Sequence, residues 1–240
     1  MEYTTLGPTQ LKVSRIGLGT HKLDQVGDPM GLLDRAVELG INFIDTANSY
    51  GDAEKILGRW SGLDSVVLAA KVGLGVGYRA REANRSGLSA YHIERACHGS
   101  VGRLNRKIDL YQLHRPEPGM YWPEIWQAMA QLISTGNITY VGTSNFTPGQ
   151  IHKSRLEANN LRMMGVVSEQ NHFSEFHNWT DPSSYHEKNV GFIAYKALER
   201  GRLAPNGARW ALDNGADVVL VGASSVEQLE EVVRATWAER

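Results

Sequence analysis

The sequence predicts an α/β protein, a single (β/α)8 TIM barrel domain over residues 1–240, with a short N-terminal β-hairpin and shortened loops on its C-terminal side. Two observations predict this fold. Segments of strand composition alternate with segments of helical periodicity in eight units, and the strands are apolar along their length, as in a parallel sheet covered on both faces. An open doubly wound sheet is the alternative, but Gly17-Leu18-Gly19 is followed by Thr20-His21 and lacks the Gly-x-Gly-x-x-Gly phosphate turn.

The hairpin comes first. Residues 2–6 and 11–16 flank Gly7-Pro8-Thr9-Gln10, a composition typical of a turn. Residues 15–19 then form the first short, buried barrel strand.

The first helix has clear start and stop signals. Asp28 can accept hydrogen bonds from the free N–H groups of a first turn, and Pro29 has the backbone angle of a first helical position. Gly40 suits the left-handed conformation just past a helix end. Between them an apolar face recurs at helical spacing, made by Leu32, Leu33, Ala36, Val37 and Leu39.

The remaining units repeat this order. Helix starts are marked by Ser89, Pro148 and Asp181-Pro182, and Gly136 marks a helix stop. The predicted strands are residues 42–45, 65–71, 107–114, 138–143, 165–169, 190–195 and 216–221. The predicted helices are residues 53–60, 89–104, 122–135, 148–159, 181–188, 207–214 and 225–237, with Ile56, Ala96 and Val101 among the side chains expected to face inward.

Polar side chains stand where the barrel strands end. The stretch 42–51 begins as an apolar strand and ends in a polar turn that carries Asp45 and Tyr50. Later strands end similarly, with Lys71, His114, Ser144, Asn145, Gln170, Asn171, Tyr195 and Lys196. Because the carboxyl ends of all strands in such a barrel surround one cavity, we expect these side chains to line it.

The chemistry of four of these residues is coherent. A tyrosine titrates near ~10 and is alone a poor proton donor at neutral pH. The Lys71 ammonium would lower the pKa of the Tyr50 phenol, and Asp45 would hold Lys71 charged and oriented. His114 can donate a hydrogen bond to a substrate carbonyl oxygen. Tyr50 is therefore a candidate general acid for a developing oxyanion.

Simpler readings remain open for each residue taken alone. Asp45 could cap the loop that follows it, Tyr50 could be an ordinary loop tyrosine, and His114 could be a strand-end histidine. Ser144-Asn145 could cap the helix that begins at Pro148. No Gly-x-Ser-x-Gly nucleophile turn occurs, and no metal site is expected, since His21, His172 and His177 have no ligand companions at metal spacing.

Composition narrows the partners and the compartment. The formal net charge is −1 with no Lys/Arg cluster, so nucleic acid is a poor candidate partner. Cys97 is the only cysteine, so no disulfide framework is expected, and a reducing, cytoplasmic compartment fits. No window reaches ~18 uninterrupted apolar residues, so no membrane partner is expected. The oligomeric state stays open.

Several segments together resemble the aldo-keto reductases. The match includes the Asp-Thr-Ala-x-x-Tyr-Gly pattern ending at Gly51, Ala70-Lys71-Val72 and the run through His114-Arg115-Pro116. One segment alone would be weak, but seven occur in the family's order and cover almost the whole chain: residues 40–51, 70–72, 108–116, 142–146, 168–171, 194–201 and 221–231.

The resemblance implies an oxidoreductase that reduces an aldehyde or ketone by hydride transfer from NADP(H), with NAD(H) as the other cofactor, and a small-molecule carbonyl substrate. The family's catalytic tetrad falls on Asp45, Tyr50, Lys71 and His114. Ser144, Asn145 and Gln170 would bind the carboxamide, and Tyr195 would stack on the nicotinamide. The full set of cofactor contacts that the resemblance implies is Gly19, Thr20, Asp45, Ser144, Asn145, Gln170, Tyr195, Lys196, Ala197, Leu198, Gly201, Gly222, Ser224, Ser225, Gln228 and Glu231.

The sequence also departs from the family's pattern. The segment after Leu203 is short, where relatives have a long excursion that helps to enclose the cofactor. Residues 222–231 hold no basic side chain for a 2′-phosphate, and Arg202 is the nearest substitute. These features leave a second function open, a cofactor-binding sensor or accessory subunit with little turnover, similar to the potassium-channel beta subunits of the superfamily. Tyr78, Trp122 and Trp179 form a possible aromatic rim for a sugar or polycyclic ketone.

Overall fold

The barrel is closed, as the sequence predicts. The computed structural model describes residues 1–73, 87–177, 180–203 and 206–238, and Tyr78 and Trp179 of the predicted rim lie outside these ranges. Parallel strands close in the order β10-β3-β4-β5-β6-β7-β8-β9. Their bounds are β3 Ile16–Gly19, β4 Phe43–Asp45, β5 Val67–Val72, β6 Ile108–Leu113, β7 Ile138–Ser144, β8 Ser168–His172, β9 Gly191–Tyr195 and β10 Val218–Val221.

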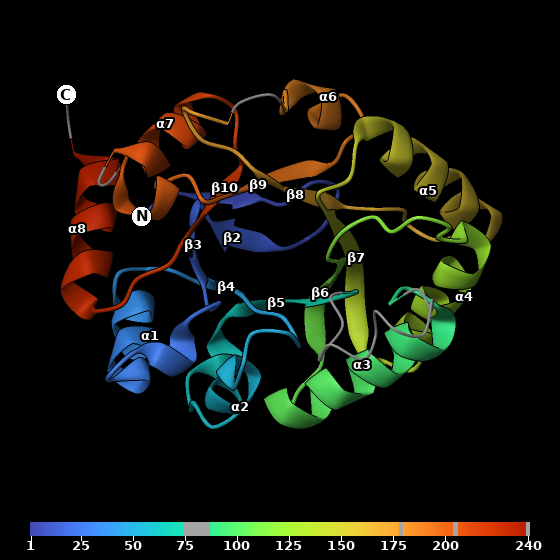
Figure 1. The fold of residues 1–240 in the computed structure, drawn as a ribbon, viewed down its shortest axis with the longest axis horizontal. Coiled ribbons are helices and arrows are strands. Elements are labelled where there is room, and N and C mark those ends of the chain that lie inside the picture. The colour runs from blue at the N-terminus through green and yellow to red at the C-terminus, as the bar shows by residue number, and fades with distance from the viewer. Residues whose placement is uncertain (74–86, 178–179, 204–205, 239–240) are drawn as a thin grey trace.

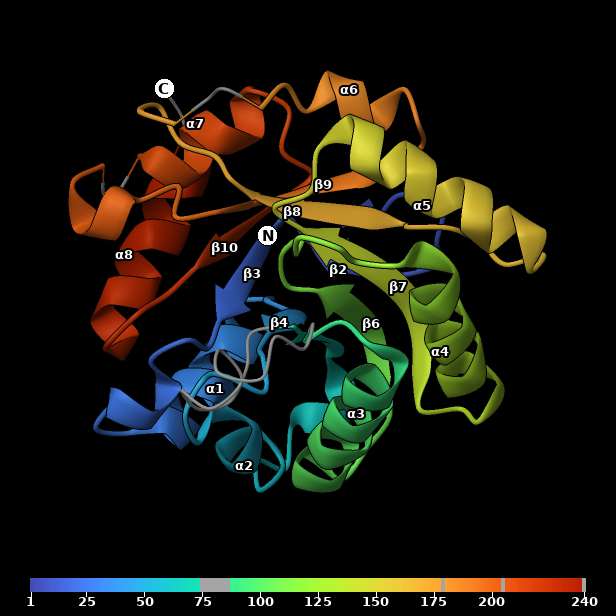
Figure 2. The same ribbon diagram turned by 45° about the vertical axis from the view of Figure 1, so that its right-hand side comes forward.

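Helices surround the strands (Figure 1), and the view in Figure 2 shows α3, α4 and α5 along one side of the barrel. Asp28 caps the first helix as predicted, because its Oδ1 accepts from the Gly31 N–H at 2.9 Å. The bounds are α1 Pro29–Glu38, α2 Ala53–Leu57, α3 Ala90–Leu104, α4 Trp122–Ser134, α5 Pro148–Asn160, α6 Ser183–His186, α7 Gly207–Asp213 and α8 Val226–Trp237, with short 3-10 turns η1 Leu23–Gln25, η2 Leu63–Ser65 and η4 Glu199–Gly201.

The predicted hairpin is confirmed, and it closes the end of the barrel opposite the C-terminal mouth. β1 (Tyr3–Thr5) pairs antiparallel with β2 (Lys12–Ser14). Leu6 and Val13 are fully buried in one cluster with interior side chains of the strands, Phe43, Ala69, Leu110, Val167, Ile193, Val218 and Leu220. The contact is so close that a Cβ on Gly7, which has φ +54°, would lie 2.2 Å from the Val167 carbonyl oxygen. With this end filled, the C-terminal mouth is the end available for chemistry.

One strand was placed wrongly by the sequence. Residues 165–169 were expected, but β8 runs from Ser168 to His172. The apolar run Gly165-Val166-Val167 precedes the ladder, whose pairing with β9 starts at Ser168 opposite Gly191. Because Glu169, Gln170 and Asn171 are buried polar residues, hydropathy gives no sign that the strand continues through them.

Smaller differences concern helix ends and burial. The helices expected over 53–60 and 181–188 are shorter, Ala53–Leu57 and Ser183–His186. Ile56, Ala96 and Val101 are only partly buried, although they pack against the core. Among the described residues, no helix has the length and apolar character needed to cross a membrane.

Candidate active site

Asp45 and Lys71 form a buried ion pair at the C-terminal ends of β4 and β5. Side chains alternate along a strand, so Ala69 and Lys71 share the barrel interior, while Leu68, Ala70 and Val72 pack against the helices. The Lys71 ammonium donates to both carboxylate oxygens of Asp45 at 2.6 Å and to the Thr46 carbonyl at 3.2 Å. Burial by itself disfavours the ammonium, but Asp45 and Tyr50 offset this and raise the pKa of Lys71, which stays charged.

Tyr50 reaches the same point from the turn after β4. Its hydroxyl lies 3.5 Å from the Lys71 Nζ, and its ring stacks on the His21 ring, with centroids 4.8 Å apart and an interplanar angle of 14°. The turn favours glycine at Gly51, because its φ of +53° is a left-handed conformation that other residues rarely adopt. The phenol is therefore held with its hydroxyl toward the ammonium.

The pKa of Tyr50 is a correction to the sequence analysis. Burial of the phenol has the largest effect and raises the pKa of Tyr50 above its ordinary value; Lys71 acts to lower it, as expected, and Asp45 acts to raise it. The phenol thus holds its proton throughout the physiological range. Lys71 remains the group that stabilises the phenolate once the proton has left.

His114 is the fourth side chain of this group. Its ring meets the Tyr50 ring edge-on at 5.9 Å between centroids, and it is 9% exposed. Burial, with the nearby charges of Lys71 and Arg115, lowers the pKa of His114 to about 3. Its buried Nδ1 has no hydrogen-bond partner among the described residues, which fits a neutral imidazole that faces a ligand.

The buried neutral state of His114 predicts acid sensitivity. Its pKa of about 3 in the folded protein lies below the unfolded value of 6.5, so the unfolded chain takes up a proton first as the pH falls. This group should therefore lower the free energy of unfolding between pH 6.5 and pH 3 by about 1.4 kcal/mol per pH unit. When urea unfolding is measured at pH 7 and at pH 5, the free energy of unfolding should fall less for His114→Asn than for the wild type. His98→Asn changes an exposed position of α3 and should behave as the wild type. Equal losses in all three proteins would contradict this reading.

The predicted carboxamide-binding residues also meet at this mouth. The Ser144 hydroxyl donates to the Gln170 carbonyl at 2.8 Å, and the Asn145 amide donates to the His114 carbonyl at 3.0 Å. The Tyr195 hydroxyl donates to the Asn145 Oδ1 at 2.7 Å. Asn145 adopts a left-handed φ of +65°, a conformation that asparagine tolerates better than most residues.

The helix-cap reading of Ser144-Asn145 is wrong. α5 is capped by Thr147, whose hydroxyl accepts from the Gln150 N–H while the Gln150 side chain accepts from the Thr147 N–H. Ser144 and Asn145 are thus left to the barrel mouth, where both lie beside strand β8.

Most of the other predicted cofactor residues lie at the ends of neighbouring elements, whereas Glu231 lies in the middle of α8. The Thr20 N–H and hydroxyl both donate to the Asp45 carbonyl at 2.9 Å, directly after Gly19. Ser225 caps α8 by accepting from the Gln228 N–H. Lys196, Ala197, Leu198 and Gly201 follow β9, and Gly222, Ser224 and Glu231 lie after β10 or in α8.

Gln112 is a site residue that was not predicted from the sequence. It is fully buried on β6, opposite Lys71 in the ladder, and its amide donates to the Gln170 Oε1 at 3.0 Å and reaches the Asp45 Oδ1 at 3.4 Å. Gln112 therefore links the Asp45–Lys71 ion pair to Gln170, one of the predicted carboxamide-binding residues. Two-residue alternation back from His114 could have identified this position.

Glu169 was also missed as a polar anchor of the mouth. It is fully buried, and its carboxyl accepts from the Phe146 N–H at 2.8 Å and from the Thr143 hydroxyl. Burial raises the pKa of Glu169 well above its usual range. It holds the backbone just after Ser144 and Asn145 in place.

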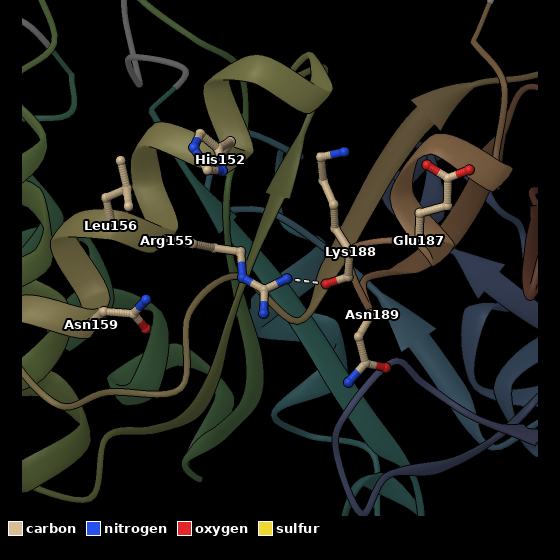
Figure 3. A pocket seen from close by; sticks show the side chains of 7 residues that line it. All are labelled: His152, Arg155, Leu156, Asn159, Glu187, Lys188 and Asn189. Atoms are coloured by element: carbon tan, nitrogen blue, oxygen red, sulfur yellow. Dashed lines mark hydrogen bonds between the residues drawn. The ribbon is translucent and has the colours of Figure 1, made fainter.

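A separate cavity lies on the outer wall, between α5 and the residues after α6. Its volume is about 340 Å³, and Figure 3 shows the Arg155 side chain donating to the Lys188 carbonyl across it. It contains none of the tetrad residues, and its lining is His152, Arg155, Leu156, Asn159, Glu187, Lys188 and Asn189.

Comparisons with known proteins show the family to which the chain is similar. Residues 15–208 match the family described as "Aldo/keto reductase family". The chain is 35% identical over 222 residues to "Uncharacterized oxidoreductase YrpG" of Bacillus subtilis (strain 168), covering 85% of this chain and 68% of that protein. It is 30% identical over 240 aligned residues to "Probable voltage-gated potassium channel subunit beta" of Oryza sativa subsp. japonica, covering 89% of this chain and 71% of that protein.

Proposed function

Because the chain belongs to the aldo/keto reductase family, we propose that it is a nicotinamide-dependent oxidoreductase that reduces an aldehyde or ketone to the alcohol. The observation that carries this proposal is the cluster at the barrel mouth. A protonated phenol lies 3.5 Å from a buried ammonium, which is itself held by a carboxylate. Such a set can deliver a proton to an oxyanion and stabilise the phenolate left behind.

The residues at the mouth fit a nicotinamide cofactor. The amide and hydroxyl groups of Ser144, Asn145 and Gln170 offer donors and acceptors for a carboxamide, and Tyr195 offers an aromatic face beside them. NADP(H), with NAD(H) as the second choice, is the proposed cofactor, and it would supply the hydride when bound.

The roles of the tetrad follow from its geometry. Tyr50 donates its proton to the carbonyl oxygen of the substrate, and Lys71 stabilises the resulting phenolate. Asp45 keeps Lys71 charged and fixed in the barrel. His114, neutral and buried, orients the carbonyl oxygen through a hydrogen bond from its ring. A cytoplasmic location and a small carbonyl substrate belong to the same proposal.

A direct assay tests the proposal. Purified protein with NADPH or NADH and a panel of aldehydes and ketones should oxidise the reduced cofactor in a substrate-dependent way. If no aldehyde or ketone of a broad panel increases the rate of cofactor oxidation, the protein is not a carbonyl reductase.

The second candidate is a cofactor-binding sensor or accessory subunit, which the similarity to the rice channel-subunit protein favours. Such a protein would bind the nucleotide tightly but turn over slowly, and it would copurify with a partner. Single-turnover and steady-state rates of cofactor oxidation, measured on the same preparation, separate the two functions.

The protein should bind NADPH and NADH with similar affinities. Residues 222–231 include three glutamates and no basic residue, so the segment lacks the guanidinium or ammonium that a 2′-phosphate prefers. Arg202 lies over the Phe176 ring at 5.3 Å. Calorimetric titration should give dissociation constants for NADPH and NADH that differ by less than about tenfold. A preference above about a hundredfold would show that another cation binds the phosphate.

A further inference from the structure

Two histidines and a glutamate meet beside the barrel mouth, outside the catalytic tetrad. His172 is the last residue of β8, His177 lies five positions later, and Glu199 begins the η4 turn. No ligand companion for these histidines was predicted from the sequence, because Glu199 is more than twenty positions away in the chain. The fold brings one potential ligand atom from each residue to within 4.8 Å of the others.

The three side chains converge on one point. His172 Nε2 lies 2.8 Å and His177 Nδ1 lies 2.9 Å from the same carboxylate oxygen, Oε1 of Glu199. The two imidazole rings stack, with centroids 4.1 Å apart. Both rings therefore present a nitrogen to the carboxylate from the same side.

The position of Glu199 is held by its surroundings. The Ser174 hydroxyl donates to the same Oε1, and Glu199 and Arg200 are consecutive non-glycine residues with φ of +45° and +57°. Left-handed backbone at such residues costs free energy and persists only where the structure enforces it. The turn is thus built to aim this carboxylate at the two histidines.

The donor set matches the preferences of one class of ion. Two imidazoles and a carboxylate are ligands of zinc and of neighbouring divalent transition metals, and three protein ligands leave a further position open. The side chains are between 13% and 43% exposed, so an ion can enter from solvent.

We propose that His172, His177 and Glu199 form a binding site for a divalent transition-metal ion, with zinc as the best match. Binding would replace the two hydrogen bonds to Oε1 by metal–ligand bonds. The ion would tie the end of β8 and the loop after it to the η4 turn. The His172 ring also stacks on the Tyr195 ring, with centroids 5.7 Å apart. The ion would therefore lie close to Tyr195, the residue proposed to stack on the nicotinamide.

The test uses the full chain and does not depend on activity. After treatment with a chelator, calorimetric titration with zinc should give one equivalent of binding and a rise in the melting temperature. Titration with Co²⁺ should produce the visible absorption bands of a site with fewer than six ligands. His177→Ala and Glu199→Gln should each weaken zinc binding by more than about a hundredfold, the upper end of what is lost when only a supporting group around a metal is removed.

A matched control is available in the same molecule. His186 Nε2 lies 2.9 Å from the Asp217 Oδ2, a single imidazole–carboxylate pair, and His186→Ala should leave zinc binding unchanged. If Glu199→Gln alters the turn, the cobalt spectrum of the wild type and the His177→Ala variant decide the question. Absence of zinc binding to the wild type, or equal binding by His177→Ala and the wild type, would mean that the three residues form a hydrogen-bonded cluster only.

Discussion

Tyr50→Phe should lower the turnover number for carbonyl reduction by a factor on the order of 10² to 10⁴, the usual contribution of a general acid. The substitution removes the hydroxyl that lies 3.5 Å from the Lys71 ammonium, while the ring can keep its stacking on His21. Because the phenol is proposed to act on the substrate oxygen, the dissociation constant of the reduced cofactor should stay within about twofold of the wild type.

Steady-state assays and cofactor titrations measure this prediction. Tyr121→Phe is the matched control, since Tyr121 is 65% exposed, and it should behave as the wild type. Because the pKa of Tyr50 is raised above its ordinary value by burial, the acid should stay protonated, and the wild-type rate of the chemical step should not fall from deprotonation of this group at neutral or mildly alkaline pH. Normal turnover by Tyr50→Phe would refute its role as the proton donor.

Lys71→Met should destabilise the fold by about 3–5 kcal/mol at pH 7, in addition to removing activity. Lys71 and Asp45 are 1% and 2% exposed, and the variant leaves the Asp45 carboxylate buried without its counter-ion. The double variant Asp45→Asn/Lys71→Met removes both charges, so it should recover much of the lost stability while remaining inactive.

Urea unfolding measures these differences. Lys55→Met is the matched control. Lys55 and Asp52 are also 2.6 Å apart, but their side chains are 55% and 63% exposed, so this variant should lose little stability.

The pH dependence gives an independent check. Burial acts to raise the pKa of Asp45, so in Lys71→Met the folded state takes up a proton before the unfolded state as the pH falls. The variant should therefore regain stability relative to the wild type at lower pH. Two results would contradict a buried ion pair. One is a loss of stability in Lys71→Met no larger than that in Lys55→Met. The other is a stability difference between Lys71→Met and the wild type that grows as the pH falls.

Local sequence signals predicted most of the barrel. The start of α1 is encoded in Asp28 and Pro29, whose capping and backbone angle act within one turn. The end of β8 was misplaced because its buried residues are polar, and their hydrogen bonds to other strands, such as that between Gln112 and Gln170, leave no trace in hydropathy.

The sequence by itself determined that the tetrad side chains share one end of the barrel. Parallel strands place their carboxyl ends on the same side, so a polar residue at each strand end reaches the mouth whatever the details of packing. Only the tertiary structure decided the protonation of Tyr50 and the grouping of His172, His177 and Glu199. The burial of Tyr50 and the meeting of the three metal-site residues both depend on side chains that come from distant positions in the chain. No local segment of the sequence specifies such an environment, so neither could be predicted from the sequence.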